Sequence, residues 1–380
     1  MRILVFCPYY PPHIGGLETH SDEFNKHLAQ NGTDVVVFTP NIPYTRNVEE
    51  IKYDRVKIVR YPAFEIIPNY PVPKFWSLGF WNPFIILFHS DFDIVISRTR
   101  FFLSSLLALI YAKLARTYWI HIEHGSDFVK LSNPLKSAVA KVYDLTFGRI
   151  IFCFSNINIS ISRAVQGFVV RFDKRPSPII YRGIDFASID TISADDTIKQ
   201  KYPGKIIIST AARLYKWKGI EFTIEAIRAL PEVTRAKIVF LIMGDGEDFT
   251  RLKSLTANLP IEMLGNLPRE EVLAILKSSD IYIHSSLPGG GLSTSLLEAM
   301  YCQCAIVATK NEGADEIIID EKTGFLIDAP NEARIVEKIG LLITDIHKRT
   351  LLAEAGHAAV FQRFDWEKTI KQYLKIFKNI

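Results

Sequence analysis

Short apolar runs alternate with amphipathic stretches along most of the chain. In the first half, four runs have the length and character of buried strands: Ile3–Phe6, Val35–Thr39, Ile94–Ser97 and Tyr118–Ile122. Between the first two runs, Leu17, Phe24 and Leu28 fall on one face of a helix over Leu17–Gln30, and Asn31-Gly32 ends it. This order of elements predicts a parallel sheet with helices on both faces.

The alternation stops at a polar segment and then starts again. Residues 186–204 contain the acidic stretch Asp190–Asp196 and end in Pro203-Gly204, so we interpret them as a linker. Strands return at Ile206–Thr210, Ile238–Met243, Ile281–His284 and Ala305–Ala308. The sequence therefore predicts an α/β fold with two doubly wound, Rossmann-like parallel-sheet domains, at residues 1–185 and 205–360. The helix within residues 361–380 is a candidate to cross back to the first domain. Ligands bind beyond the carboxyl ends of such strands, so we expect a shared site in a cleft between the domains.

Composition narrows the function classes. The chain has 380 residues, 48% of them hydrophobic and 23% charged, which favours a folded protein with a sizeable core. A net charge of +4 is too small to indicate nucleic-acid binding, but it is compatible with binding to anionic ligands or to an anionic membrane surface. The four cysteines match no zinc or disulfide spacing, which indicates reduced thiols in a cytoplasm. The apolar runs are too short to span a membrane, so we expect any membrane contact to be peripheral, on the inner face.

The segment over residues 287–300 is the most informative one. Gly289, Gly290 and Gly291 precede a run of helical character and, lacking a Cβ, let backbone N–H groups approach a ligand closely. Leu292 and Ser293 follow them, and the helix directs its positive end toward the same point, which favours an anion. Glu298 has the reach to hold a sugar hydroxyl. Phosphate and ribose recognition together predict a nucleotide site.

Other candidate residues follow the ends of expected strands. Arg213 and Lys218 are two cations across a turn that leads into a helix; they could hold a diphosphate or belong to a solvated basic loop. Gly15-Gly16 either brings backbone to a ligand at a helix N-terminus or makes an ordinary βα turn. The glycine at Gly244 permits a sharp turn, and Asn266-Leu267 could present backbone groups to a base; each is a weak signal alone.

His124 follows the strand Tyr118–Ile122 and precedes Gly125, so it could point toward a sugar or the reacting centre. A metal site made of His121, Glu123 and His124 is disfavoured, because alternation along a strand puts His121 and Glu123 on one face and His124 on the other.

Together and in this order, these residues resemble a family-4 retaining glycosyltransferase of the GT-B architecture. The motifs that carry the resemblance cover nearly the whole chain: Gly15-Gly16-Leu17-Glu18, His124-Gly125, Arg182-Gly183-Ile184-Asp185, Arg213 with Lys218-Gly219, Gly244-Asp245-Gly246, Leu296-Leu297-Glu298-Ala299-Met300 and Thr323-Gly324-Phe325-Leu326. The chain departs from the family pattern at two places. Arg182 stands where the family usually has Asn, and Gly290 stands where the family commonly has the first of two glutamates eight positions apart.

The resemblance implies a role for each matched residue. Arg213 and Lys218 would clamp the donor diphosphate, with Gly16 approaching it from the first domain, and His124 would lie near the transferred sugar. Glu298 would hold the ribose hydroxyls, and the backbone of Gly291–Ser293 would contact sugar or phosphate. Family members use a nucleotide sugar, generally need no metal or other cofactor, and keep the anomeric configuration. We therefore expect UDP- or GDP-sugar chemistry on a glycan or lipid-linked acceptor, in cell-envelope polysaccharide or lipopolysaccharide biosynthesis.

Two alternatives stay open at this point. One is a sugar-nucleotide epimerase of the same architecture, which would rely on acidic residues that the sequence does not display convincingly. The other is a non-catalytic subunit that binds nucleotide sugars, which Gly290 makes plausible.

The acceptor side is marked by aromatic residues. The segment Phe75–Phe84 is dense in aromatic side chains, and together with nearby arginines it suits a membrane interface or a lipid-linked acceptor. Packing in the core is the alternative, and for the apolar run Leu103–Leu114 it has at least equal weight.

Overall fold

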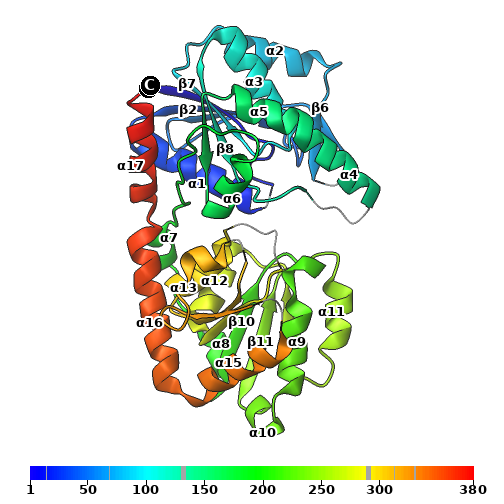
Figure 1. Cartoon of the computed structure of the whole chain (residues 1–380), viewed down its shortest axis with the longest axis vertical. Helices are drawn as coiled ribbons and strands as arrows, with labels where there is room; N and C mark the ends of the chain where they lie inside the picture. Colours follow the sequence, from blue (N-terminus) through cyan, green and yellow to red (C-terminus); the bar gives the residue numbers. More distant parts are fainter. Residues whose placement is uncertain (14, 68, 130–133, 288–291, 312, 329–330) are drawn as a thin grey trace. The chain divides into compact units, whose positions relative to one another are not determined.

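The computed structural model describes the chain except for residues 14, 68, 130–133, 288–291, 312 and 329–330. Its contacts divide the chain into two compact units, each built on its own sheet (Figure 1). Unit 1 comprises Met1–Gly183 and Trp366–Ile380, and unit 2 comprises Ile184–Asp365.

Unit 1 contains a seven-stranded sheet in the order β3-β4-β2-β1-β7-β8-β9. Its strands are β1 (Arg2–Phe6), β2 (Asp34–Pro40), β3 (Glu49–Lys52), β4 (Val56–Tyr61), β7 (Ile94–Arg98), β8 (Tyr118–Glu123) and β9 (Ile157–Ser160). All neighbours pair in parallel except the edge strand β3, which runs antiparallel to β4. A separate antiparallel hairpin joins β5 (Ala63–Ile67) to β6 (Tyr70–Pro73).

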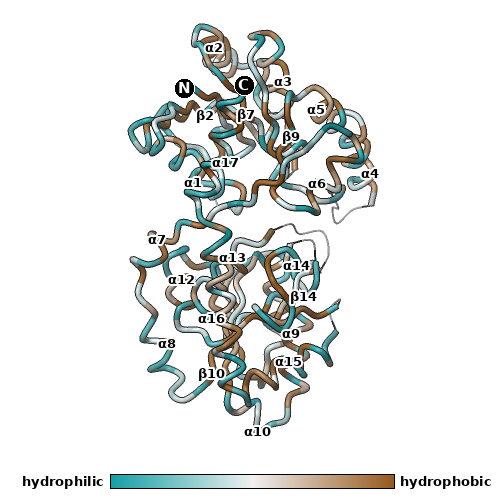
Figure 2. The backbone as a smooth tube through the Cα atoms, turned by 60° about the vertical axis from the view of Figure 1, so that its left-hand side comes forward, coloured by the Kyte–Doolittle hydropathy of each residue, from teal (hydrophilic) through white to brown (hydrophobic). Residues whose placement is uncertain are grey.

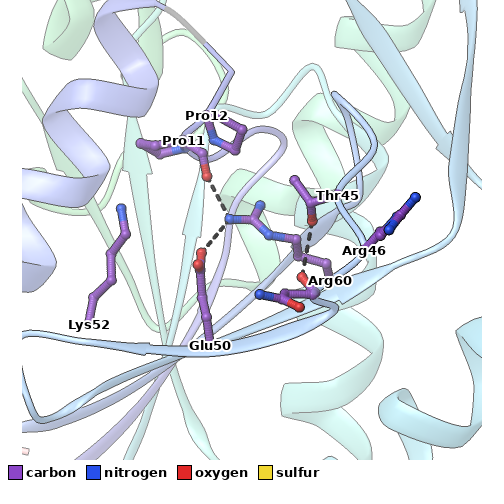
Figure 3. Close-up of a pocket in the computed structure, with 8 residues that line it drawn as sticks. Pro11, Pro12, Thr45, Arg46, Glu50, Lys52 and Arg60 are labelled. Carbon is purple, nitrogen blue, oxygen red and sulfur yellow. Dashed lines mark hydrogen bonds and ion pairs between the residues drawn. The ribbon is translucent and has the colours of Figure 1, made fainter.

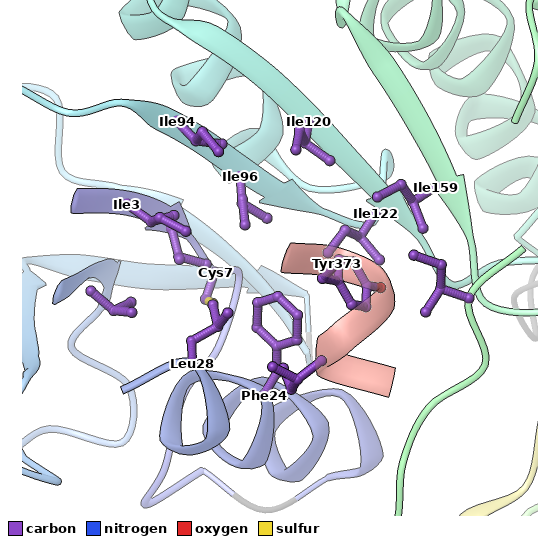
Figure 4. Packing of buried hydrophobic residues seen from close by; sticks show 14 of the residues in the cluster. Ile3, Cys7, Phe24, Leu28, Ile94, Ile96, Ile120, Ile122, Ile159 and Tyr373 are labelled. Atoms are coloured by element: carbon purple, nitrogen blue, oxygen red, sulfur yellow. The ribbon is translucent and has the colours of Figure 1, made fainter. Parts of the chain in front are cut away.

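Helices cover both faces of this sheet. They are α1 (Gly16–Gln30), α2 (Leu78–Leu87), α3 (Leu103–Ala115), α4 (Pro134–Tyr143), α5 (Arg149–Phe154), α6 (Arg163–Val169) and α17 (Trp366–Phe377). Alternate side chains of each strand point to opposite faces, so residues such as Ile3 pack with α1, α6 and α17, whereas Leu4 packs with α2 and α3. Figure 4 shows the first of these cores, where Phe24 of α1 meets Tyr373 of α17 edge to face, with ring centroids 4.8 Å apart.

The chain's last helix therefore belongs to unit 1, although the residues before it belong to unit 2. Trp366, at the start of α17, is 1% exposed and donates its indole N–H to Glu23 of α1 over 3.1 Å. Gly183 fits beside it, because a Cβ at Gly183 would lie 2.5 Å from the Trp366 Cα. The motif glycine at Gly183 is thus explained by the packing of α17.

Unit 2 contains a six-stranded, wholly parallel sheet in the order β12-β11-β10-β13-β14-β15. Its strands are β10 (Ile206–Ala211), β11 (Ile238–Met243), β12 (Ile261–Gly265), β13 (Ile281–His284), β14 (Ala305–Thr309) and β15 (Phe325–Ile327). The helices are α7 (Phe186–Asp190), α8 (Asp196–Lys201), α9 (Ile220–Ala229), α10 (Glu232–Arg235), α11 (Phe249–Leu255), α12 (Arg269–Ser278), α13 (Thr294–Tyr301), α14 (Ala314–Ile317), α15 (Glu332–Thr344) and α16 (Ile346–Arg363). Helices α9 and α15 pack on the core face that contains Ile208, and α12 and α13 contact the sheet as well.

Residues 186–204 do not form the linker that the sequence predicts. They contain α7 and α8 and are part of unit 2, where Ile189 and Ile198 are buried. Asp185 and Asp195 cap the two helices by accepting the backbone N–H groups of Ser188 and Thr197. The acidic residues that make the segment look like a polar linker are therefore partly helix caps.

The aromatic segment before β7 is also more ordered than an exposed loop. Its second half forms α2, in which Phe80 and Phe84 are buried in the core. Trp76 and Leu78 are each 74% exposed. The segment thus divides into a core-facing part and an exposed part. The apolar run Leu103–Leu114 forms α3, which buries Leu107 and Tyr111 and leaves Leu114 exposed.

Candidate active site

In unit 2 the predicted donor residues follow the carboxyl ends of four neighbouring strands of the sheet. Arg213 and Lys218 follow β10, Gly244 follows β11, Asn266 and Leu267 follow β12, and Leu292, Ser293 and Glu298 follow β13. Doubly wound sheets bind their ligands beyond these carboxyl ends of the strands. Gly290 and Gly291 lie outside the described residues.

Backbone contacts hold these loops against one another. The N–H of Gly244 donates to the carbonyl of Gly265 over 2.7 Å, which ties the end of β11 to the end of β12 beside Asn266. Leu214 N–H donates to Asp245 over 2.9 Å. Gly244 has φ of +133°, and a Cβ there would collide with the backbone oxygen of Ala212. Glycine is therefore required at Gly244 by the close approach of the loop that carries Arg213.

The loop that carries Lys218 is fixed in the same way. Gly219 adopts φ of +62°, and a Cβ there would collide with the backbone oxygen of Ser285, just beyond β13. The Ser285 hydroxyl donates to the Lys218 carbonyl over 3.1 Å. Lys218 is consequently held beside the chain that leads into the glycine-rich segment.

The electrostatics around Lys218 favour an anion. Burial, and then the charge of Arg213, lower the pKa of the Lys218 ammonium to about 8. Lys218 forms no ion pair with any residue that the structure describes, and its Nζ lies 4.2 Å from the centroid of the Trp217 ring. Its neighbour His284 is buried, and burial followed by the Lys218 charge lowers the pKa of that imidazole to about 3. Two cations that raise each other's energy are stabilised when an anion binds between them.

Glu298 lies on α13 and is 6% exposed. Its Oε1 accepts hydrogen bonds from Nε and Nη2 of Arg269, over 3.1 and 2.9 Å. Ser293 caps the same helix by accepting the N–H of Leu296. Arg269, the first residue of α12, is not among the residues that the sequence predicts for the site. The available signal was a cation two residues beyond Asn266-Leu267, at the start of a helix. Arg269 fixes the orientation of the carboxylate that is predicted to hold ribose.

In unit 1 the predicted residues also follow strand ends. Gly15 is the N-cap of α1 and Gly16 its first residue. A Cβ at Gly16 would meet no described atom within 4 Å, so packing within the described chain does not require glycine there. The open space beside Gly16 is consistent with a ligand at this helix end.

His124 directly follows β8 and lies within a cluster of histidine and arginine side chains. Its ring meets that of His20 edge to face at 5.1 Å, and Arg98 Nη1 lies 3.0 Å from His20 Nδ1. Burial, and then the positive charge of Arg98, lower the pKa of His124 to about 3, although Glu123 opposes this shift. His124 is therefore neutral near pH 7, so a ligand beside it would meet a hydrogen-bonding imidazole rather than a charged acid.

The residues beside His124 lie as the alternation of the strand predicts. His121 Nε2 is 3.2 Å from Glu123 Oε2, on the face opposite to His124. Glu123 also pairs with Arg100, whose guanidinium reaches Asp144. Burial alone raises the pKa of the Glu123 carboxyl, but Arg100, His121 and the Gly125 N–H together lower it to about 2. Glu123 is thus a structural carboxylate that holds the end of β8.

The chain matches two family models that adjoin one another. Residues 14–188 match the model described as Glycosyltransferase Family 4, and residues 192–359 match the model described as Glycosyl transferases group 1. An uncharacterized glycosyltransferase from Methanocaldococcus jannaschii is 45% identical over 388 residues, which cover 100% of this chain and 99% of that protein. The chain belongs to the family-4 glycosyltransferases. The GPI3 subunit of phosphatidylinositol N-acetylglucosaminyltransferase from Saccharomyces cerevisiae is 25% identical over 394 residues, covering 100% of this glycosyltransferase and 83% of the yeast protein.

Solved structures show the same fold. Sucrose-phosphate synthase from Thermosynechococcus elongatus superposes with a TM-score of 0.83 at 16% identity, covering 100% of this glycosyltransferase and 98% of that chain. HepE from Anabaena, solved in complex with UDP-glucose, has a TM-score of 0.77 at 18% identity, with both chains covered completely. The fold of this glycosyltransferase is GT-B, as the sequence resemblance predicts.

Proposed function

We propose that this glycosyltransferase moves a hexose or N-acetylhexosamine from a nucleoside diphosphate sugar to a glycan or lipid-linked acceptor of the cell envelope. The observation that carries the proposal is the pair Arg213 and Lys218 at the ligand-binding edge of unit 2, where burial and Arg213 lower the pKa of Lys218 to about 8. The structure of HepE with UDP-glucose supports a UDP-sugar, and the name of the yeast relative supports N-acetylglucosamine and a phosphatidylinositol-like acceptor.

We propose a retaining, metal-independent reaction. As the bond between the anomeric carbon and the phosphate oxygen breaks, negative charge grows on the departing diphosphate, and Arg213 and Lys218 offset it. The acceptor hydroxyl attacks from the face that the diphosphate leaves and gives its proton to that phosphate. Glu298, oriented by Arg269, accepts the ribose hydroxyls. His124 supplies a neutral hydrogen bond to the transferred sugar.

A panel of nucleoside diphosphates tests this function. We expect calorimetry to show that one of UDP, GDP and ADP binds most tightly, and that the matching sugar is transferred in the presence of EDTA with its anomeric configuration kept by NMR. Failure of all three diphosphates to bind would reject the donor assignment. Loss of turnover in EDTA would reject the metal-independent route, and an inverted product would reject retention.

We further propose peripheral contact with a membrane on its cytoplasmic side through the exposed part of the aromatic segment. Trp76 and Leu78 are each 74% exposed, and Ile86 on α2 is 62% exposed. No helix among the described residues combines the length and apolar character that crossing a bilayer requires. Exposed aromatic and aliphatic side chains on a chain with a net charge of +4 suit the interface of an anionic membrane.

The double variant Trp76→Ala/Leu78→Ala should lower binding to anionic liposomes about tenfold or more, because each large apolar side chain contributes roughly 1.5–3 kcal/mol on burial. Flotation at low salt measures this. The matched control is Val233→Ala/Ile346→Ala, which removes two apolar side chains of similar exposure, 74% and 67%, from unit 2. Equal flotation of both variants and the wild type would contradict a membrane role for this segment.

A further inference from the structure

Unit 1 contains a cavity of about 570 Å³ that the proposed donor site does not use (Figure 3). It is lined by Pro11 and Pro12 of the loop between β1 and α1, by the segment Thr45–Asn47 after β2, and by side chains of β3 and β4. Three of the lining residues are cations, Arg46, Lys52 and Arg60, and Glu50 is an anion. The cavity therefore has an excess of positive charge.

Arg60 forms the wall of this cavity and is only 3% exposed. Its Nη2 donates to the Pro11 carbonyl over 2.6 Å and to Glu50 Oε1 over 2.7 Å. Its Nη1 is buried and has no hydrogen-bond partner among the residues that the structure describes. A buried guanidinium N–H without a hydrogen-bond acceptor destabilises the folded protein. Such a group in the wall of a charged cavity therefore indicates a ligand that supplies the missing hydrogen-bond acceptor.

The other two cations stand at the open side. Lys52 is partly buried, and its Nζ lies 3.7 Å from Asp22 Oδ2, a long ion pair. Arg46 is exposed and forms no ion pair within the described part of the chain. The three cations Arg46, Lys52 and Arg60 face the carboxylates of Glu50 and Asp22, which leaves one net positive charge at the cavity. A phosphate group matches this charge and offers several acceptor oxygens that guanidinium and ammonium N–H groups can share.

The cavity lies where a ligand of unit 1 is expected. Pro11 and Pro12 belong to the loop that also holds Gly15 and Gly16, and this loop follows the carboxyl end of β1. We propose that the cavity binds a phosphate group of the acceptor, with Arg60 as the buried contact and Arg46 and Lys52 at its rim. The identification of the ligand as the acceptor rests on the proposed function; the anion site itself rests on Arg60 and its neighbours.

Calorimetry with sn-glycerol 3-phosphate tests the site. We expect the double variant Arg46→Gln/Lys52→Gln to bind this probe at least about tenfold more weakly than the wild type, because each removed partner is a charge-assisted hydrogen bond. Arg55→Gln/Lys57→Gln is the matched control: it removes two exposed cations of the same β3–β4 region outside the cavity, and binding should stay within about twofold. Arg213→Ala should also keep this binding.

The variant Arg60→Gln is expected to abolish binding of the probe. This substitution also leaves Glu50 and the Pro11 carbonyl without their partner, so Arg60→Gln could fail to fold. In that case the double variant Arg46→Gln/Lys52→Gln, here called the rim variant, decides the test. Phosphatidylcholine vesicles with and without phosphatidic acid distinguish a lipid phosphate from a soluble one. Binding of only the vesicles with phosphatidic acid, lost in the rim variant, assigns a lipid acceptor, and binding of both probes assigns the phosphate alone.

Unchanged binding in the rim variant, or no binding of either probe by the wild type, would overturn the phosphate site. UDP, GDP and ADP titrated in parallel separate this failure from that of the proposed function. If one diphosphate binds normally while the cavity variants change nothing, only the phosphate site is wrong. If none of the three binds while the rim variant loses glycerol 3-phosphate, the donor assignment is wrong and the anion site stands.

Discussion

Replacing Arg213 by alanine should lower kcat by about a hundredfold to a thousandfold, with a smaller effect on the binding of the intact donor. The reason is that the charge on the departing diphosphate is largest in the transition state, so a cation aimed at it stabilises that state more than the ground state. Arg213 is exposed, and its removal should leave the thermal unfolding of the protein nearly unchanged.

Single-turnover and steady-state assays with the donor that the diphosphate panel identifies would measure this loss. Lys216→Ala is the matched control, since Lys216 is an exposed cation three residues away in the same loop and should change kcat by less than about twofold. A subunit that only binds nucleotide sugars would still support its partner's activity after Arg213→Ala. Wild-type turnover in this variant would therefore reject Arg213 as part of the reaction.

The sequence predicts the strands that are buried on both faces and largely apolar: β1, β2, β7 and β8 in unit 1, and β10, β11, β13 and β14 in unit 2. Such strands appear as apolar runs, for example the unbroken run Ile238–Met243. Figure 2 shows brown, hydrophobic stretches of the backbone inside each unit. The edge strands β3, β9 and β15, the half-exposed strand β12 and the inner strand β4 escape the same reasoning. In β4, Lys57 and Arg60 interrupt the apolar run. In β3, Glu49–Lys52 alternates charged and apolar residues and is mostly exposed, so its pattern resembles a polar loop.

The short helices α7 and α8 were missed for a related reason. Each has five or six residues, too few for a helical period to show, and their caps Asp185 and Asp195 are also typical of loops. Their helical state depends on packing: Ile189 and Ile198 are buried in unit 2. A helix that is held by the burial of one side chain cannot be predicted from the pattern of apolar residues in the sequence.

Within the candidate site, sequence identifies residues that follow strand ends and misses those whose role depends on a distant partner. Arg213 and Lys218 are found because they flank a turn after β10. Arg269 is missed because its partner Glu298 lies 29 residues away on another helix, and Arg60 is missed because it contacts Pro11 over a separation of 49 residues. Position relative to a strand end is local information, whereas an ion pair between elements requires the topology.

Replacing Lys218 by alanine should lower kcat by about a hundredfold, since we propose that Lys218 offsets charge on the same leaving group as Arg213. Unlike Arg213, the Lys218 side chain should also make the affinity for the diphosphate depend on pH. Burial and Arg213 lower the pKa of Lys218 to about 8 in the free protein. A bound diphosphate favours the charged ammonium and raises that pKa, so binding takes up a proton wherever the free lysine is neutral.

The sign of the effect follows from this proton uptake. Below pH 8 Lys218 is already charged in the free enzyme, and the affinity for the diphosphate should be nearly independent of this group. Above pH 8 the affinity should fall by up to about tenfold for each pH unit, until the pH reaches the raised pKa of the complex. Calorimetric titrations of the preferred diphosphate between pH 7 and about pH 9.5 would measure the slope.

The variant Lys218→Arg separates the titration of this side chain from that of the nucleotide. A guanidinium remains charged across the whole range, so the decline above pH 8 should disappear while binding below pH 8 is largely kept. A nucleobase that loses a proton would affect both proteins equally. The same decline in Lys218→Arg, or a flat profile in the wild type, would show that the ammonium of Lys218 does not face the diphosphate, and the assignment of the cation pair would then rest on Arg213 alone.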